Sequence, residues 1–238
     1  MSAVHVANLR VAFGERIVFD GLALDVARGE ILAVLGPSGC GKSTLLRAIA
    51  GLDVHPEGTI AVDGEVGYVF QEPRLFPWLS VEQNVRFAAR TAEERARVEQ
   101  VLALTGLDDA AKALPKALSG GMAQRASLAR TLVRKPSVLL LDEPLAALDA
   151  LRRMQLQEAL AEIIAAVRAS AVLVTHDIEE ALYLADRVVV LSGSPAYVAL
   201  EIAIPPHKRR NRDVDLTRER SALFHALTGE CARREESA

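Results

Sequence analysis

The sequence predicts an α/β fold built around a mainly parallel sheet. Short apolar segments rich in β-branched residues, at 137–144, 170–177 and 187–193, alternate with a helical pattern at 151–167. This alternation is typical of βαβ units, whose parallel strands are buried on both faces. A glycine-rich loop, "GPSGCGKST" at 36–44, also stands between a predicted strand and a predicted helix, which is the order that a phosphate-binding loop requires.

The elements before and after this loop differ in kind. Three stretches at 4–13, 16–26 and 29–36 have the composition of strands, and the helical pattern "KSTLLRAIAGL" follows the last of them. From about residue 80 to 134 the periodicity becomes helical, so we expect a helical subdomain inserted at that point.

We predict one domain over residues 1–204, which includes the helical insertion, and a short tail over 205–238 that is partly helical. The tail contains a Pro-Pro pair and the basic run "HKRRNR". We interpret this run as a solvated surface rather than a phosphate-binding patch.

Composition limits the partners that this chain can have. Its 238 residues are 50% hydrophobic and 25% charged, with a net charge of −3, so no overall positive field attracts nucleic acid and no nucleic acid partner is expected. No apolar run is long enough to span a membrane and the first residues lack an apolar signal core, so a role at a membrane requires a partner. The two cysteines, Cys40 and Cys231, do not have the spacing of metal ligands.

The glycine-rich loop predicts a nucleotide triphosphate site. Glycines at three of its positions allow the backbone N–H groups to turn inward around phosphate oxygens. Lys42 supplies positive charge to the β- and γ-phosphates, and the Ser43 hydroxyl is a ligand for Mg²⁺. The predicted nucleotide-binding residues of the loop are Gly36, Pro37, Ser38, Gly39, Cys40, Gly41, Lys42, Ser43 and Thr44.

Polar side chains at the ends of later strands predict the catalytic groups. Asp142 is placed to hold Mg²⁺, and Glu143 to accept a proton from the attacking water. His176, at the end of another strand, can reach the γ-phosphate, and Gln71 the metal or the water. Taken singly, these residues have ordinary alternatives: the acidic pair and the histidine can cap helices, and Gln71 can be a surface amide.

A second glycine-rich sequence, "LSGGMAQR" from Leu118, opens another helical pattern but has no evident phosphate of its own. With it, the chain resembles the ATP-binding-cassette ATPases over nearly its whole length. The motifs occur in the family's order: Walker A at 36–44, the glutamine loop at Gln71, the signature at 118–124, Walker B at 138–142 followed by Glu143, the D-loop at 145–149 and the switch His176.

This resemblance implies a P-loop NTPase core with an N-terminal antiparallel β subdomain, ATP and Mg²⁺ as cofactors, and Ser43, Gln71 and Asp142 at the metal. It also implies a head-to-tail homodimer, in which Ser119, Gly120, Gly121 and Asp149 of one chain complete the nucleotide site of the other. An aromatic residue ahead of the phosphate loop usually stacks on adenine. Phe13 fits that position, although it can also be an aromatic residue of the core or of an edge strand.

Further segments resemble the ATPases of nitrate, sulfonate and taurine importers: residues 69–85, Met122 in the signature, and the tail. Membrane permease subunits, a periplasmic or lipid-anchored solute-binding protein reached indirectly, and a peripheral position on the cytoplasmic face of the inner membrane are then implied. Residues 76–79 form an apolar patch suited to the permease's coupling helix, unless Trp78 belongs to the core of the helical subdomain. A soluble cassette acting on nucleic acid or ribosomes and another class of ABC transporter are the alternatives, and the solute is left open.

One segment departs from the family pattern. The sequence passes from "VDG", ending at Gly64, almost directly to the strand before Gln71, where members of the family usually carry a longer segment. We expect the small β subdomain to be trimmed there.

Overall fold

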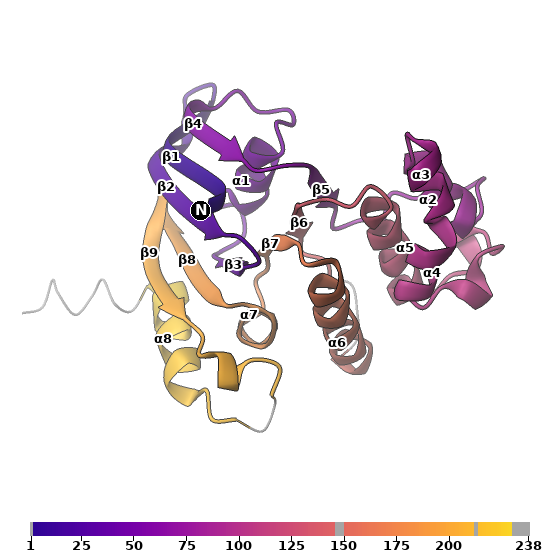
Figure 1. The fold of residues 1–238 in the computed structure, drawn as a ribbon. Helices are drawn as coiled ribbons and strands as arrows, with labels where there is room; N and C mark the ends of the chain where they lie inside the picture. Colours follow the sequence, from indigo (N-terminus) through magenta and orange to yellow (C-terminus); the bar gives the residue numbers. More distant parts are fainter. Residues whose placement is uncertain (1, 146–149, 212–213, 230–238) are drawn as a thin grey trace, which may run out of the picture.

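The chain folds around one sheet with helices on both faces, seen in the computed structural model of Figure 1. The structure describes residues 2–145, 150–211 and 214–229. Within them the sheet has nine strands in the order β4-β1-β2-β9-β8-β3-β7-β6-β5. The strands are β1 (Ser2–Phe13), β2 (Arg16–Ala27), β3 (Ile31–Leu35), β4 (Glu57–Val62), β5 (Val66–Val69), β6 (Val138–Asp142), β7 (Ser170–Val174), β8 (Arg187–Gly193) and β9 (Ala196–Ala203).

The two ends of the sheet differ in strand direction. Strands β8, β3, β7, β6 and β5 are parallel neighbours, as the alternating pattern predicts. At the other end β4, β1 and β2 pair antiparallel, β9 pairs antiparallel with β8, and a single parallel bridge from Phe19 to Ala196 joins β2 to β9. The predicted fold class, a mainly parallel core with an N-terminal antiparallel part, is confirmed.

The helices within the described residues fall into two sets. The helices α1 (Lys42–Ile49), α6 (Ala150–Val167), α7 (Ile178–Leu184) and α8 (Thr217–Thr228) lie against the sheet, and α2 (Val81–Ala88), α3 (Ala92–Ala96), α4 (Val98–Leu104) and α5 (Gly120–Leu132) form a helical lobe beyond β5 (Figure 1). Short 3₁₀ helices span Asp108–Ala110, Pro115–Ala117 and Pro206–Lys208. No helix among the described residues is long and apolar enough to cross a membrane.

Two hydrophobic cores lie on opposite faces of the sheet. Along β3 every side chain is buried, and alternate residues face opposite ways: Ala33 and Leu35 join the core under α6 and α7, whereas Leu32 and Val34 join the core under α1. Successive side chains of a strand point to opposite faces of the sheet, and here both faces are covered by a core. The sequences of β3, β6 and β7 are therefore continuous apolar runs.

Local signals explain where the helices of the lobe begin. Ser80 precedes α2 and Thr91 precedes α3, and each forms a capping box in which its side chain accepts the N–H three residues on while that residue's side chain returns the bond. Ser119 caps α5 by accepting from the N–H of Met122 at 3.3 Å. The insertion therefore begins at a capped helix, close to the predicted residue 80.

Two features go beyond the sequence-based expectations. Strand β9 was not predicted from the sequence, although its side chains alternate between exposed and less exposed positions as in a half-buried strand. The basic run is not simply a solvated surface: Lys208 and Arg209 are half-buried and pair with Glu219 and Asp186. Between β4 and β5 the link is residues 63–65, as short as the sequence indicates.

Candidate functional site

The candidate site lies where the parallel strands end. The loop after β3 leads into α1, Gln71 follows β5, Asp142 ends β6, and His176 follows β7. Because these strands are parallel, their carboxyl ends share one edge of the sheet, which is where open α/β sheets bind ligands. We call this group the strand-end site.

The phosphate loop is held in a fixed form by its own backbone. The Lys42 side chain is buried, and its Nζ donates to the carbonyl oxygens of Gly36 at 2.7 Å and Pro37 at 3.0 Å. Gly41 has a φ of 108°, and a Cβ there would lie 2.5 Å from a methyl carbon of Val18, so another residue at this position would meet both strain and a clash. The loop is therefore held around the lysine side chain by contacts within the chain itself.

A cleft of about 470 Å³ opens in front of this loop. Phe13, the last residue of β1, is 52% exposed at its wall. The lining residues are Phe13, Arg16, Val18, Ser38, Gly39, Gly41, Lys42, Ser43, Thr44 and Glu143. The structure thus brings most of the predicted loop residues, Phe13 and Glu143 to one cleft.

The remaining loop residues lie elsewhere. Pro37 and Cys40 line an adjoining cavity of about 210 Å³, which shares Ser38 and Gly39 with the cleft and also includes Gly193. A Cβ on Gly36 would meet the Cys40 Sγ and the Leu191 carbonyl oxygen, each at 2.8 Å, so Gly36 allows the loop to approach β8 closely. Gly36, Pro37 and Cys40 therefore lie on the side of the loop that packs near β8.

Asp142 is held by two hydroxyl groups. Ser43 Oγ donates to its Oδ1 at 2.8 Å and the Tyr68 hydroxyl donates to its Oδ2 at 2.9 Å. Burial, together with the neighbouring Asp142 charge, raises the pKa of Tyr68, so this phenol stays a proton donor. A carboxylate and a hydroxyl in contact are the oxygen ligands that Mg²⁺ takes in phosphate sites, so these residues fit the metal.

Glu143, Gln71 and His176 meet at one carboxylate oxygen. His176 Nδ1 lies 3.2 Å from Glu143 Oε2, and Gln71 Nε2 donates to the same atom at 3.5 Å. Glu143 has a φ of 45°, in the left-handed region, and its N–H donates to the Val174 carbonyl oxygen at 2.9 Å. The backbone at the end of β6 is thereby tied to β7, which keeps Glu143 and His176 close together.

Two residues that hold this site were not predicted from the sequence. Arg16 Nη2 donates to the Gly39 carbonyl oxygen at 2.9 Å, so the turn between β1 and β2 supports the phosphate loop. Tyr68 is the second. The signal for Tyr68 was available, because it lies on the strand that leads directly to Gln71; nothing in the sequence alone pairs Arg16 with a loop more than twenty residues away.

The signature residues are not part of the cleft. Ser119 and Gly120 are exposed at the first turn of α5, and Gly121 is half-buried. None of the three lines the cleft of the same chain. Asp149 of the predicted D-loop lies outside the described residues.

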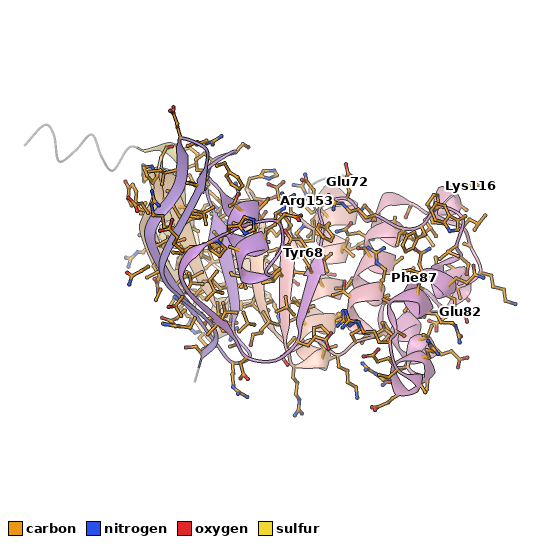
Figure 2. All side chains as sticks on the ribbon, turned by 90° about the horizontal axis from the view of Figure 1, so that it is seen from above. Tyr68, Glu72, Glu82, Phe87, Lys116 and Arg153 are labelled. Carbon is orange, nitrogen blue, oxygen red and sulfur yellow. The ribbon has the colours of Figure 1, made fainter. Side chains whose placement is uncertain are left out.

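An aromatic patch lies on the helical lobe. The Phe76 ring packs against those of Trp78 and Phe87, with centroids 5.6 and 4.7 Å apart, and Trp78 is 71% exposed. The fully buried Asn84 fixes the loop by accepting from the Phe76 N–H and donating to the Phe76 and Leu79 carbonyl oxygens. In Figure 2 Phe87 lies on the lobe, apart from Tyr68 at the sheet. The alternative that Trp78 is a core residue is wrong.

A glycine-rich phosphate loop at a helix start, with an acidic strand end opposite it, defines a P-loop nucleotide-binding protein. The chain belongs to the ABC transporter family: the ABC transporter family model matches residues 19–146. The resemblance read from the motifs is confirmed.

Relatives and one solved structure agree with this assignment. The chain is 49% identical over 223 residues to the aliphatic sulfonates import ATP-binding protein SsuB 1 of Pseudomonas aeruginosa, covering 88% of this chain and 90% of that protein. It is 48% identical over 238 residues to SsuB 2 of Burkholderia cenocepacia, with 94% and 88% covered. The dimeric ATP-binding cassette MJ0796, in a post-hydrolysis state bound to ADP and Pi, has a TM-score of 0.73 at 30% identity, covering 85% of this chain and 99% of that one. The chain is an ATPase that binds and hydrolyses ATP.

Proposed function

We propose that this ATPase energises uptake of an aliphatic sulfonate or a similar small solute. The observation that carries the proposal is the identity of 47–49% over nearly the whole chain to proteins named for sulfonate import. The strand-end site supports it, because the groups that ATP hydrolysis needs converge there. Nitrate and taurine, from the same group of importers, are the other solutes to compare.

We assign the chemical roles from the geometry of the site. Glu143 accepts a proton from the water that attacks the γ-phosphorus, and the phosphorus–oxygen bond to ADP breaks. His176, 3.2 Å from the Glu143 carboxylate, and Gln71 orient this carboxylate and the water. Lys42 and the N–H groups at the start of α1 bind the β- and γ-phosphates, and Phe13 stacks on the adenine.

Mg²⁺ fits between the loop and β6. Ser43 and Asp142 would hold it, with Gln71 as a further oxygen ligand, and the ion would neutralise charge that develops on the phosphate oxygens. Tyr68 keeps the Asp142 carboxylate turned toward Ser43 through its hydrogen bond. This arrangement matches the preference of Mg²⁺ for one or two carboxylates combined with phosphate and water.

The proposed function requires two interfaces, one with a second copy of the chain and one with a permease subunit. Ser119, Gly120 and Gly121, exposed at the start of α5, donate to the γ-phosphate held by a second copy of the chain, and Asp149 contributes at the same interface. The aromatic patch binds the coupling helix of a permease subunit. The chain then lies peripherally on the cytoplasmic face of the inner membrane, and an external solute-binding protein delivers the solute to the permease.

The first test is capture of the partner. Tagged Glu143→Gln protein keeps its ATP site but loses the proton acceptor, so it should stay in the ATP-bound form with turnover reduced by roughly a thousand-fold. We expect it to co-purify with a multi-span protein from detergent-solubilised membranes of the native host, identified by mass spectrometry.

Trp78→Ser added to the Glu143→Gln protein is the matched control. It should lose the membrane protein while it still binds ATP, because Trp78 is exposed and does not line the cleft at the phosphate loop. Recovery of ribosomal proteins or nucleic acid, with no membrane protein, would keep the ATPase chemistry and reject the importer. The solute follows from uptake assays with sulfonate, taurine and nitrate in a strain that lacks this gene.

A further inference from the structure

The residue before His176 is held by a buried carboxyl group that has no role in the chemistry above. Thr175 is 1% exposed, and its Oγ1 donates to Glu180 Oε2 at 2.5 Å while accepting from the Asp177 N–H at 3.1 Å. Glu180 lies in the first turn of α7 and is 2% exposed. The hydroxyl therefore links the end of β7 to the helix that follows.

A second set of bonds holds the residue after His176. Asp177 caps α7, since its Oδ1 accepts from the N–H groups of Glu179 at 2.9 Å and Glu180 at 3.2 Å. Its Oδ2 accepts from Arg153 Nη1 on α6 at 2.9 Å. Both neighbours of His176 are thus fixed by side-chain contacts.

His176 itself is in a different situation. Its side chain is 57% exposed, and Glu143 is its only ion-pair partner among the described residues. An exposed ring with one ion-pair partner does little to fix its own backbone, so we infer that its distance from Glu143 depends on Thr175 and Asp177. Burial of a carboxyl group costs free energy unless the group is hydrogen-bonded, and here the Thr175 hydroxyl supplies that hydrogen bond.

We propose that Glu180 is a positioning residue for His176, acting through the Thr175 hydroxyl to set the histidine against Glu143. The inference rests on the proposed role of His176 in hydrolysis. Burial raises the Glu180 pKa to about 7, and the nearby Asp177 charge adds to this effect, whereas Thr175 and Arg153 oppose it. Glu180 Oε1 has no hydrogen-bond partner among the described residues, which leaves it free to carry the proton.

The test compares substitutions that break the link with one that keeps it. Glu180→Leu removes the acceptor and Thr175→Val removes the donor. Each should lower kcat by roughly ten- to hundred-fold, since small misplacements of catalytic groups have effects of this size, while the ATP Kd changes less than about two-fold. Glu180→Gln keeps a carbonyl acceptor for Thr175 and should recover most of the turnover.

Thr105→Val is the matched control. Thr105 is also buried and its hydroxyl bonds to the carbonyl oxygens of Val101 and Leu102, but it lies in the helical lobe. This variant loses a similar buried hydroxyl without touching the strand-end site, so its kcat should match the wild-type value. Circular dichroism on every variant shows whether it folds.

Non-additivity separates positioning from a general structural role. If Glu180 acts through His176, then Glu180→Leu should lower kcat no further in a His176→Ala background. The proposal is overturned if the folded Thr175→Val protein has the kcat of Thr105→Val, or if Glu180→Leu and His176→Ala lower kcat multiplicatively. A His176→Ala protein with the wild-type kcat would instead refute the proposed role of His176 in hydrolysis, so the two failures are distinguishable.

Discussion

The two glycine-rich loops of this protein both open a helix, yet they differ in how their polar groups are used. In the loop before α1, Lys42 is buried on two carbonyl oxygens, Arg16 holds the Gly39 carbonyl, and Ser43 bonds to Asp142. In the loop before α5, the Ser119 hydroxyl does no more than cap its own helix, and the first residues of the turn are exposed.

This difference shows which half of the site a single chain can build. The phosphate loop is shaped by contacts within the chain, so we expect nucleotide to bind to one chain alone. The signature loop presents unused N–H groups at a helix start, an arrangement that favours an anion, but its own cleft is lined without it. This agrees with the proposal that the signature loop acts on nucleotide held by a second chain, and the solved cassette of similar fold is dimeric.

The largest expected effect on ATPase activity comes from substituting one residue in each loop, in separate chains. Lys42→Ala should lose ATP binding, whereas Ser119→Arg should bind ATP and lose turnover by at least roughly a hundred-fold. Each homodimer is inactive. In a mixed dimer, the intact Lys42 of one chain meets the intact Ser119 of the other, so activity should return when the two variants are combined and purified through two different tags.

The double variant shows whether the signature loop completes the nucleotide site of the other chain or that of its own chain. A chain that carries both Lys42→Ala and Ser119→Arg, paired with wild type, has no intact composite site and should be inactive. If the signature instead served its own chain, the wild-type partner would remain active and the mixture of single variants would not. The ATPase rates of the two mixed dimers decide between these arrangements.

The sequence predicts the phosphate loop well because its chemistry is local. Glycines, a lysine and a serine at fixed spacing, placed between a strand and a helix, are enough to define the loop. The acidic end of β6 and the end of β7 are also foreseeable, since parallel strands bring their carboxyl ends to one edge. Alternation and turn signals similarly predict most of the sheet and the helical insertion.

Contacts between distant residues are where prediction from the sequence stops. Arg16 supports the phosphate loop from another element, and no periodicity links it to Gly39. The buried Glu180 falls in a helical segment where a charged residue is normally exposed. The positions of these residues depend on tertiary packing, which cannot be predicted from a pattern along the chain.

A smaller effect tests the burial of Glu180 on α7. Because folding raises the Glu180 pKa from an ordinary value near 4.5 to about 7, the folded chain keeps a proton that the unfolded chain loses between these values. The stability contributed by this group is fully present below pH 4.5 and is lost as the pH rises through 7. Relative to Glu180→Gln, the wild type should lose up to about 3 kcal/mol of unfolding free energy between pH 4.5 and 8.

Urea unfolding of the two proteins at both pH values measures this difference. Glu179→Gln is the control, because Glu179 is the exposed neighbour on α7 and pairs with Arg220 at the surface. It should show the wild-type pH dependence within experimental error. Parallel curves for wild type and Glu180→Gln would mean that folding does not raise the pKa of Glu180.

The smallest expected effect concerns the wall of the cleft. Phe13 is 52% exposed, so stacking on adenine should contribute on the order of 1 kcal/mol. Phe13→Ala should weaken ATP binding by roughly five-fold, measured by calorimetry in the Glu143→Gln background to prevent turnover, whereas Phe13→Tyr keeps the ring and should bind as wild type does.

Phe224→Ala is matched to this change, because Phe224 is also 52% exposed but lies on α8, away from the cleft. If both alanine variants bind ATP equally well, Phe13 is a surface aromatic residue and the adenine contact must be sought elsewhere on the cleft wall. A weaker affinity for Phe13→Ala in a chain that also carries Ser119→Arg would place the adenine contact entirely on the phosphate-loop side. The nucleotide would then be bound by one chain before the second chain closes over it.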